Sequence, residues 1–224
     1  MTSPLDVSAL VSPPSRSTTP RAGVQAGRIV GRHNFVRDCL LRWIAHAARC
    51  ISEPTLHPLQ PLDEFRHRTA NTAPDARSDI LVEGLVAPFH HLLVDVAIFN
   101  RHEASYEHRD IPAVFRDLEM RKGRGYRERA AVVEHASFVP FIASSLGALG
   151  PAAQHFMKLV ARHVAGKTGE TYSNTIMLMR SDLNFTILRA ALACLRGPRS
   201  TPFKADIWAM TPAYVRALAR FDPA

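Results

Sequence analysis

The sequence predicts an α/β protein in which helices flank a small mixed β-sheet in three layers, preceded by a disordered N-terminal tail. Long segments with apolar residues at helical spacing are interspersed with short segments rich in β-branched residues. Proline and glycine separate many of these segments. We expect a tail over residues 1–27, a domain over residues 28–197 and a C-terminal extension over residues 198–224.

The N-terminal part of the chain changes character near residue 28. Residues 1–27 are rich in Ser, Pro, Thr and Ala, a composition that buries too little apolar surface to offset the entropy lost on ordering. From Asn34 to Cys50, apolar side chains recur at helical spacing with arginines between them, which predicts an amphipathic basic helix. Ile51–Leu56 is a candidate for a short strand, ended by Pro54 and Pro58.

Two further strands are predicted on either side of a short turn. Asp79–Leu85 and His91–Phe99 are apolar, β-branched segments, and the residues between them, 86–90, contain a proline. Neighbouring strands bring facing side chains together. We therefore expect Asp79 and Asp95 to point toward one shared site.

The second half of the chain predicts a helix, a strand and two more helices. Pro112–His135 is helical by composition, although Gly123 and Gly125 weaken its middle. The elements expected after it are the strand Ser137–Ser144, the helix Pro151–Val164 with Gly166 after its end, and the helix Asn174–Leu195. The predicted order is thus helix, three strands, helix, strand and two helices.

Composition narrows the class of partner and the compartment. The formal charge is +8 and the isoelectric point is near 10.0, which favours a polyanionic partner such as nucleic acid. The three cysteines are far apart and form no CxxC motif, so neither a disulfide framework nor a cysteine zinc site is indicated. No apolar run is as long as the roughly 18 residues that a membrane span needs, and we expect an intracellular, soluble protein with no membrane partner.

Two acids and a lysine indicate a metal-dependent hydrolase. Asp95 lies in the middle of an apolar strand, where a carboxylate is costly unless a cation sits beside it. With Asp79, with the Val96 carbonyl and with Glu83 on the Asp79 strand as an outer ligand, it would form a site for Mg²⁺ or Mn²⁺. Lys122 would orient the attacking water or meet the negative charge that develops on a phosphodiester. The alternative is that the aspartates cap turns and the lysine is only solvated.

Arginines near these residues suit phosphate contacts. Arg32, Arg37 and Arg42 recur along the first predicted helix, and Arg121 and Arg124 flank Lys122, toward the nucleic-acid backbone. Such contacts do not require an active site. A DNA- or RNA-binding module without hydrolysis is therefore a separate hypothesis.

The order of several motifs resembles that of one known family. The motifs are Arg32-His33-Asn34, Glu53-Pro54, Arg77-Ser78-Asp79, Val94-Asp95, Lys122 to Tyr126, Phe138 to Phe141 and Gly147 to Gly150. This succession resembles the restriction-endonuclease-like domain, of the PD-(D/E)xK class, at the C-terminal end of reverse transcriptases from site-specific non-LTR retrotransposons. The resemblance covers residues 30–197 approximately.

The resemblance implies a domain that nicks target DNA. It implies that Asp79 and Asp95 match the two metal-binding acids, and that Lys122 matches a lysine moved to the helix after the strand, since Ala97 holds the usual position. Tyr126, four residues after Lys122, would share its helix face.

The resemblance also bears on origin and partners. The sequence has no polymerase domain, and a Pro/Ser-rich tail stands where family members carry a Cys/His zinc segment. We therefore expect a free-standing or truncated copy, nuclear in a eukaryote, whose reverse transcriptase is encoded elsewhere. A retroelement remnant without function is the remaining alternative.

Overall fold

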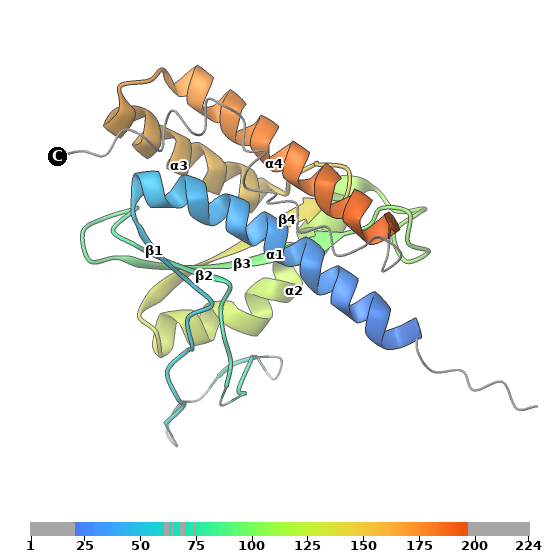
Figure 1. Cartoon of the computed structure of the whole chain (residues 1–224). Coiled ribbons are helices and arrows are strands. Elements are labelled where there is room, and N and C mark those ends of the chain that lie inside the picture. The colour runs from blue at the N-terminus through green and yellow to red at the C-terminus, as the bar shows by residue number, and fades with distance from the viewer. Residues whose placement is uncertain (1–20, 61–62, 64, 68–69, 74, 197–224) are drawn as a thin grey trace, which may run out of the picture.

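The computed structural model describes residues 21–196 except 61–62, 64, 68–69 and 74. Within this part of the chain, a helix, three strands, a helix, a strand and two helices follow one another, as the sequence predicts (Figure 1). The elements are α1 (Arg21–Ala47), β1 (Arg49–Ser52), β2 (Ile80–Glu83), β3 (His91–Phe99), α2 (Ile111–Val132), β4 (Ala136–Ser144), α3 (Pro151–Thr168) and α4 (Tyr172–Arg196).

The strands form one mixed, four-stranded sheet in the order β1-β2-β3-β4. β1, β2 and β3 pair antiparallel, whereas β4 lies parallel to β3. A helix must connect parallel neighbours, and α2 makes this crossover. Pro140 lies inside β4, which is tolerated because β4 is an edge strand whose outer side carries no ladder.

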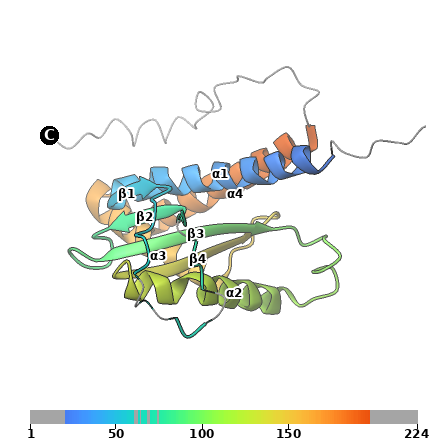
Figure 2. The ribbon, with the colours of Figure 1, turned by 90° about the horizontal axis from the view of Figure 1, so that it is seen from below.

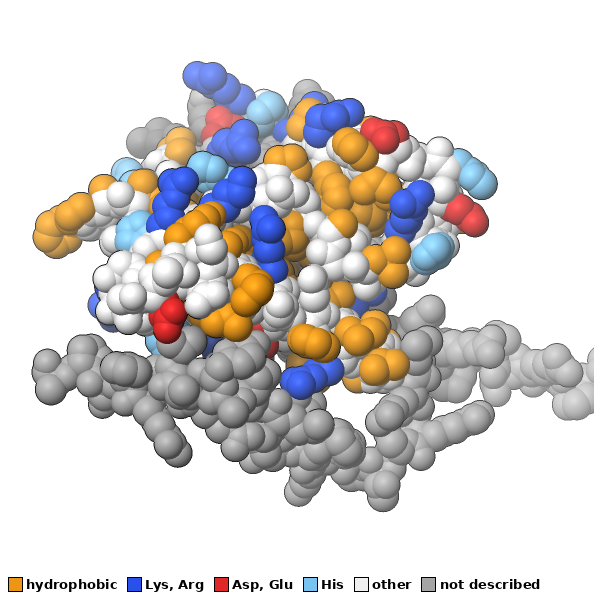
Figure 3. Space-filling model, turned by 90° about the horizontal axis from the view of Figure 1, so that it is seen from above, with side chains coloured by type: hydrophobic (Ala, Val, Ile, Leu, Met, Phe, Trp, Pro, Cys, Tyr) orange, Lys and Arg blue, Asp and Glu red, His pale blue; other side chains and the backbone are white. Residues whose placement is uncertain are grey.

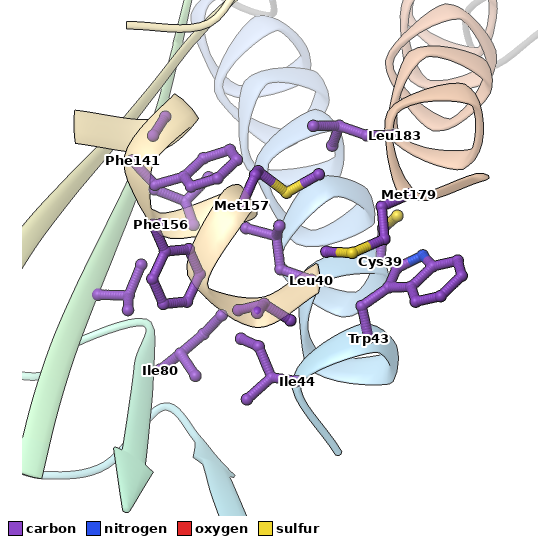
Figure 4. Close-up of a cluster of buried hydrophobic side chains, with 14 of the residues drawn as sticks. Cys39, Leu40, Trp43, Ile44, Ile80, Phe141, Phe156, Met157, Met179 and Leu183 are labelled. Carbon is purple, nitrogen blue, oxygen red and sulfur yellow. The ribbon is translucent and has the colours of Figure 1, made fainter. Parts of the chain in front are cut away.

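Helices cover both faces of the sheet (Figure 2). α1 and α3 pack on one face, α4 packs against these two helices, and α2 covers the opposite face. The main core joins apolar side chains of the sheet to those of α1, α3 and α4 (Figure 4). Alternation along β3 decides which residues enter it: Val94 and Val96 face this core, whereas Leu93, Asp95 and Ala97 face α2.

α2 remains continuous through its two glycines. Asp110 caps its first turn by accepting a hydrogen bond from the Ala113 amide at 3.2 Å, and Pro112 occupies the first turn, where no amide is needed. The buried face of the helix packs on β3 and β4. This packing outweighs the low helix propensity of Gly123 and Gly125, so the helix that carries Lys122 is intact.

Several boundaries differ from those expected. α1 begins at Arg21, inside the stretch expected to be tail, because its first turns lack the apolar periodicity that marks a helix in sequence. α3 continues past Gly166 to Thr168 and ends where Gly169 adopts a left-handed conformation at φ 72°. β2 is shorter than expected and leaves Asp79 just before its first residue. The remaining tail, residues 1–20, and the C-terminal extension lie outside the described residues.

Candidate functional site

The two predicted acids meet at the end of the β2–β3 pair. Ile80 pairs with Val94, and continuing the antiparallel register by one residue sets Asp79 opposite Asp95. The Asp79 carboxylate reaches across the end of β2 and accepts a hydrogen bond from the Val96 amide at 2.6 Å. The negative charge of Asp79 also raises the pKa of Asp95. The structure therefore brings Asp79 and Asp95 together.

Lys122 is the cation beside Asp95. Its Nζ lies 2.8 Å from Asp95 Oδ2, and the Asp95 side chain is only 8% exposed. Burial is the largest influence on Asp95 and raises its pKa, while the charge and hydrogen bonding of Lys122 act in the opposite direction. Because α2 lies over the face that carries Asp95, a lysine on this helix reaches an acid on β3.

Tyr126 lies one turn beyond Lys122 and supports it. The Lys122 ammonium is 5.7 Å from the centre of the Tyr126 ring, a cation–π distance. The opposite side of that ring stacks on Phe138 of β4, with centroids 5.6 Å apart and planes 14° from parallel. The shared helix face predicted for Lys122 and Tyr126 agrees with this geometry, but the Tyr126 ring is engaged inside the protein.

His33 completes the site from the opposite layer, and sequence reasoning gave it no role. Its Nε2 lies 3.0 Å from Asp79 Oδ2, and its Nδ1 lies 3.3 Å from the Asn34 side-chain oxygen. The hydrogen bond to Asp79 is the largest influence on His33 and raises its pKa, against the opposing effect of burial. A charged His33 and Asp79 thus form an ion pair beside the pair of Asp95 and Lys122.

The same face of α1 holds the end of β1 in place. Arg37 stands one helical turn after His33 and pairs with both Asp38 and Glu53. The Glu53 amide in turn donates to the Asp79 carbonyl at 2.9 Å. The four-residue spacing of His33 and Arg37 is the sequence pattern by which this face of α1 was open to detection.

Glu83 does not join the site, so its assignment as a metal ligand is wrong in position. It shares the strand direction of Asp79, but it pairs with His91 at the other end of β2, four residues along. At about 3.3 Å per residue this separation is about 13 Å, too far for one ion to bind both carboxylates. Glu83 instead lies 3.2 Å from Arg49.

The arginines predicted to contact phosphate divide into two groups. Those of α1 have partners within the protein: Arg32 donates to the Ile98 carbonyl at 3.1 Å, Arg37 pairs with acids, and Arg42 lies 3.3 Å from Asp182. Arg121 and Arg124 of α2 are exposed. On the face shown in Figure 3, Lys and Arg side chains are spread among apolar ones and acidic side chains are few.

The donor atoms fit one kind of metal site. Among the described residues, no three His, Cys, Asp or Glu side chains lie together as a ready group for an ion. Zinc sites and all-protein calcium cages need such a group, whereas Mg²⁺ is commonly held by one or two carboxylates with water and phosphate. Asp79 and Asp95 supply two carboxylates. The Val96 amide points to Asp79, and the N–H and C=O of one strand residue share an edge, so the Val96 carbonyl faces the same side.

Comparison with known proteins adds no relative. The chain matches no protein-family model, and no curated protein is similar to it. In the part of the chain that the structure describes, every helix is too short or too polar to cross a bilayer. The site therefore has to be interpreted from its own geometry.

Proposed function

We propose that this chain is a metal-dependent endonuclease domain of the restriction-endonuclease-like kind, which hydrolyses phosphodiester bonds in DNA. The observation that carries the proposal is the facing pair Asp79 and Asp95 on neighbouring strand positions, with Lys122 2.8 Å from Asp95. The mixed sheet and the order of helices and strands are consistent with it. The proposed retrotransposon origin, nuclear location and reverse transcriptase partner follow from the motif resemblance.

Asp79, Asp95 and the Val96 carbonyl would hold Mg²⁺ or Mn²⁺. When bound, the ion supplies charge neutralisation on the phosphoryl oxygens and lowers the pKa of a bound water. Two negative charges on one side of the sheet, with few other acids near them, suit a divalent ion that also contacts an anionic substrate.

Lys122 acts at the phosphate. Its ammonium is 30% exposed, so it contacts solvent while it also lies against Asp95. From this place it donates hydrogen bonds to the attacking water or to a nonbridging phosphoryl oxygen, where negative charge increases in the transition state. Tyr126 and Phe138 hold the side chain in that orientation.

His33 controls the availability of Asp79. While protonated, His33 pairs with Asp79 and lowers the negative charge that the carboxylate offers to an ion. Loss of this proton as pH rises through the raised pKa of His33 frees the full charge of Asp79. Nicking is therefore expected to increase with pH across that range.

Nicking of supercoiled plasmid DNA in Mg²⁺ tests the proposal. Asp95→Ala is expected to reduce the rate about 100-fold or more, the loss typical of removing a group that stabilises the transition state. Asp117→Ala is the matched control, because Asp117 lies on the exposed side of α2 and pairs only with Arg109 in a surface ion pair. Equal rates for the wild type and Asp95→Ala, or no Mg²⁺-dependent nicking by the wild type, would rule the proposal out.

Nucleic-acid binding without hydrolysis is the second candidate. One observation favours it: His33 and Lys122 already give the two acids cationic partners, so the site is electrostatically balanced without an ion. In that case, DNA binding by the wild type persists at an affinity that falls steeply with salt, and Mg²⁺ changes neither binding nor the plasmid.

A further inference from the structure

A groove on the outer side of α2 provides a second basic site. Its volume is about 530 Å³. One wall is the exposed side of α2 and the other is the segment that carries Arg66 and His67. We call it the α2 groove, and its lining residues are Arg66, His67, Met120, Gly123, Arg124, Arg127, Glu128, Ala131 and Val132.

The second wall is fixed to the helix by a network of hydrogen bonds. The Arg66 and His67 amides donate to the two Glu128 carboxylate oxygens at 2.8 and 3.3 Å. Buried Arg129 donates to the carbonyls of His57, Asn71 and Ala73 at 2.7 to 3.1 Å. The groove is therefore a constructed feature of the fold.

The charge in the α2 groove is predominantly positive. Arg66, Arg124 and Arg127 line it, and within the described residues none of the three guanidinium groups lies within ion-pair distance of a carboxylate. Glu128 is the acidic lining residue, and the backbone amide of Arg66 lowers its pKa by binding the carboxylate. That carboxylate is thus committed to holding the wall, while the guanidinium groups remain available to an anion.

Apolar side chains share the groove with these arginines. Met120 is 53% exposed and Val132 is 48% exposed, although both are large apolar residues on a helix that has a buried face available. Gly123 contributes no side chain, and the Arg127 guanidinium lies 3.4 Å from where a Cβ would stand. A ligand that fits this lining has negative charges for the arginines and apolar flat surfaces for Met120 and Val132.

We propose that the α2 groove binds a single strand of nucleic acid, with phosphates against Arg66, Arg124 and Arg127 and bases against Met120 and Val132. Single strands enter basic grooves and place their bases on protein side chains. Duplex DNA is read in the opposite manner, by a protuberant helix or ribbon that enters a groove of the DNA. A concave basic groove therefore favours the single strand.

The α2 groove lies beside the candidate active site. Gly123 and Arg124 directly follow Lys122, which points to the sheet while they line the groove. A strand bound there would extend from the scissile phosphate along the outside of α2. This connection rests on the proposed function, whereas binding of the strand does not.

Fluorescence anisotropy in EDTA tests the binding without cleavage. The probes are a labelled oligothymidylate and an abasic deoxyribose-phosphate strand of equal length. Arg124→Gln with Arg127→Gln is expected to weaken binding of both about 10-fold and to reduce the salt dependence by about 1.4, at about 0.7 per phosphate contact. The matched control is Lys158→Gln with Arg162→Gln, which removes the same charge from exposed positions on α3 and should change affinity less than about twofold.

Met120→Ala separates bases from phosphates. It is expected to weaken oligothymidylate binding about threefold or more and to leave the abasic strand unchanged, because only the former presents bases. The proposal is overturned if the arginine variant binds like the α3 control, or if it loses affinity for duplex DNA alone. Asp95→Ala should bind the strand like the wild type, so a failed nicking assay and a failed groove give different results.

Discussion

Removing the cation beside Asp95 is the perturbation whose energy follows most directly from the structure. In Lys122→Met, the side chain keeps its approximate length and loses its charge, and Asp95 stays at 6% exposure without its partner. At 2.8 Å and an effective dielectric constant of about 20, the lost attraction is about 6 kcal/mol. Because Lys122 is 30% exposed, solvent screens part of this attraction. We expect a net loss of about 2 to 4 kcal/mol at pH 7 without metal.

The pH dependence identifies the cause of that loss. Burial already raises the pKa of Asp95, so ionised Asp95 disfavours the folded state, and removing Lys122 raises this pKa further. A group whose pKa is raised on folding stabilises the folded state at low pH and loses this effect as pH rises through the folded value. The penalty of Lys122→Met should therefore shrink when pH is lowered from 7 to 5, as Asp95 takes up a proton.

Urea unfolding in EDTA measures these free energies. Arg109→Met is the control, because it breaks an ion pair whose side chains are 42% and 50% exposed, and it should cost less than about 1 kcal/mol. Adding Asp95→Asn to Lys122→Met should recover most of the loss, since no unpaired charge then remains buried. The reasoning is refuted if Lys122→Met costs no more than Arg109→Met at pH 7, or if its cost is the same at pH 5.

Three further predictions follow from buried contacts. His33→Gln should flatten the change of stability with pH above about 6.5, because the protonated pair with Asp79 stabilises the wild type at lower pH and is lost as pH rises through the raised His33 pKa; exposed His155→Gln should keep the wild-type slope. Asp182→Ala should cost about 3 kcal/mol in urea unfolding, since it leaves the Trp43 indole N–H, 2.9 Å from Asp182, and nearby Arg42 without this acceptor; a cost below about 1 kcal/mol would contradict the contact. Gly150→Ala should lower the melting temperature, because its Cβ would lie 2.5 Å from a Glu119 oxygen that binds the Ala152 amide, and Gly166→Ala, in open space, should not.

The sequence was informative where a local pattern decides the structure. His91–Phe99 is predicted with its exact bounds, because an apolar β-branched run between turn residues has one stable conformation in a sheet. The approach of Asp79 to Asp95 also follows from local order, since two strands joined by a short turn pair with each other. Gly166 was a misleading helix end because a glycine in open space interrupts nothing, whereas Gly169 takes the left-handed conformation.

Contacts between distant segments were beyond sequence reasoning. His33 reaches Asp79 across 46 positions of the chain, and that contact depends on how α1 crosses the sheet. Arg32 and Arg42 looked like solvent-facing phosphate ligands, because their partners Ile98 and Asp182 lie on elements far along the chain. For Glu83, strand alternation gave the face but not the distance along the strand.

Binding of Mn²⁺, followed by electron paramagnetic resonance, measures the proposed metal site directly. Asp79→Asn and Asp95→Asn should each abolish one Mn²⁺ site, because the two carboxylates share the ion, whereas Glu83→Gln at the other end of β2 should bind Mn²⁺ like the wild type. Circular dichroism should show all three variants folded. Equal Mn²⁺ binding by the wild type and Asp95→Asn, or no Mn²⁺ binding by the wild type, would contradict a metal-dependent nuclease centred on Asp79 and Asp95.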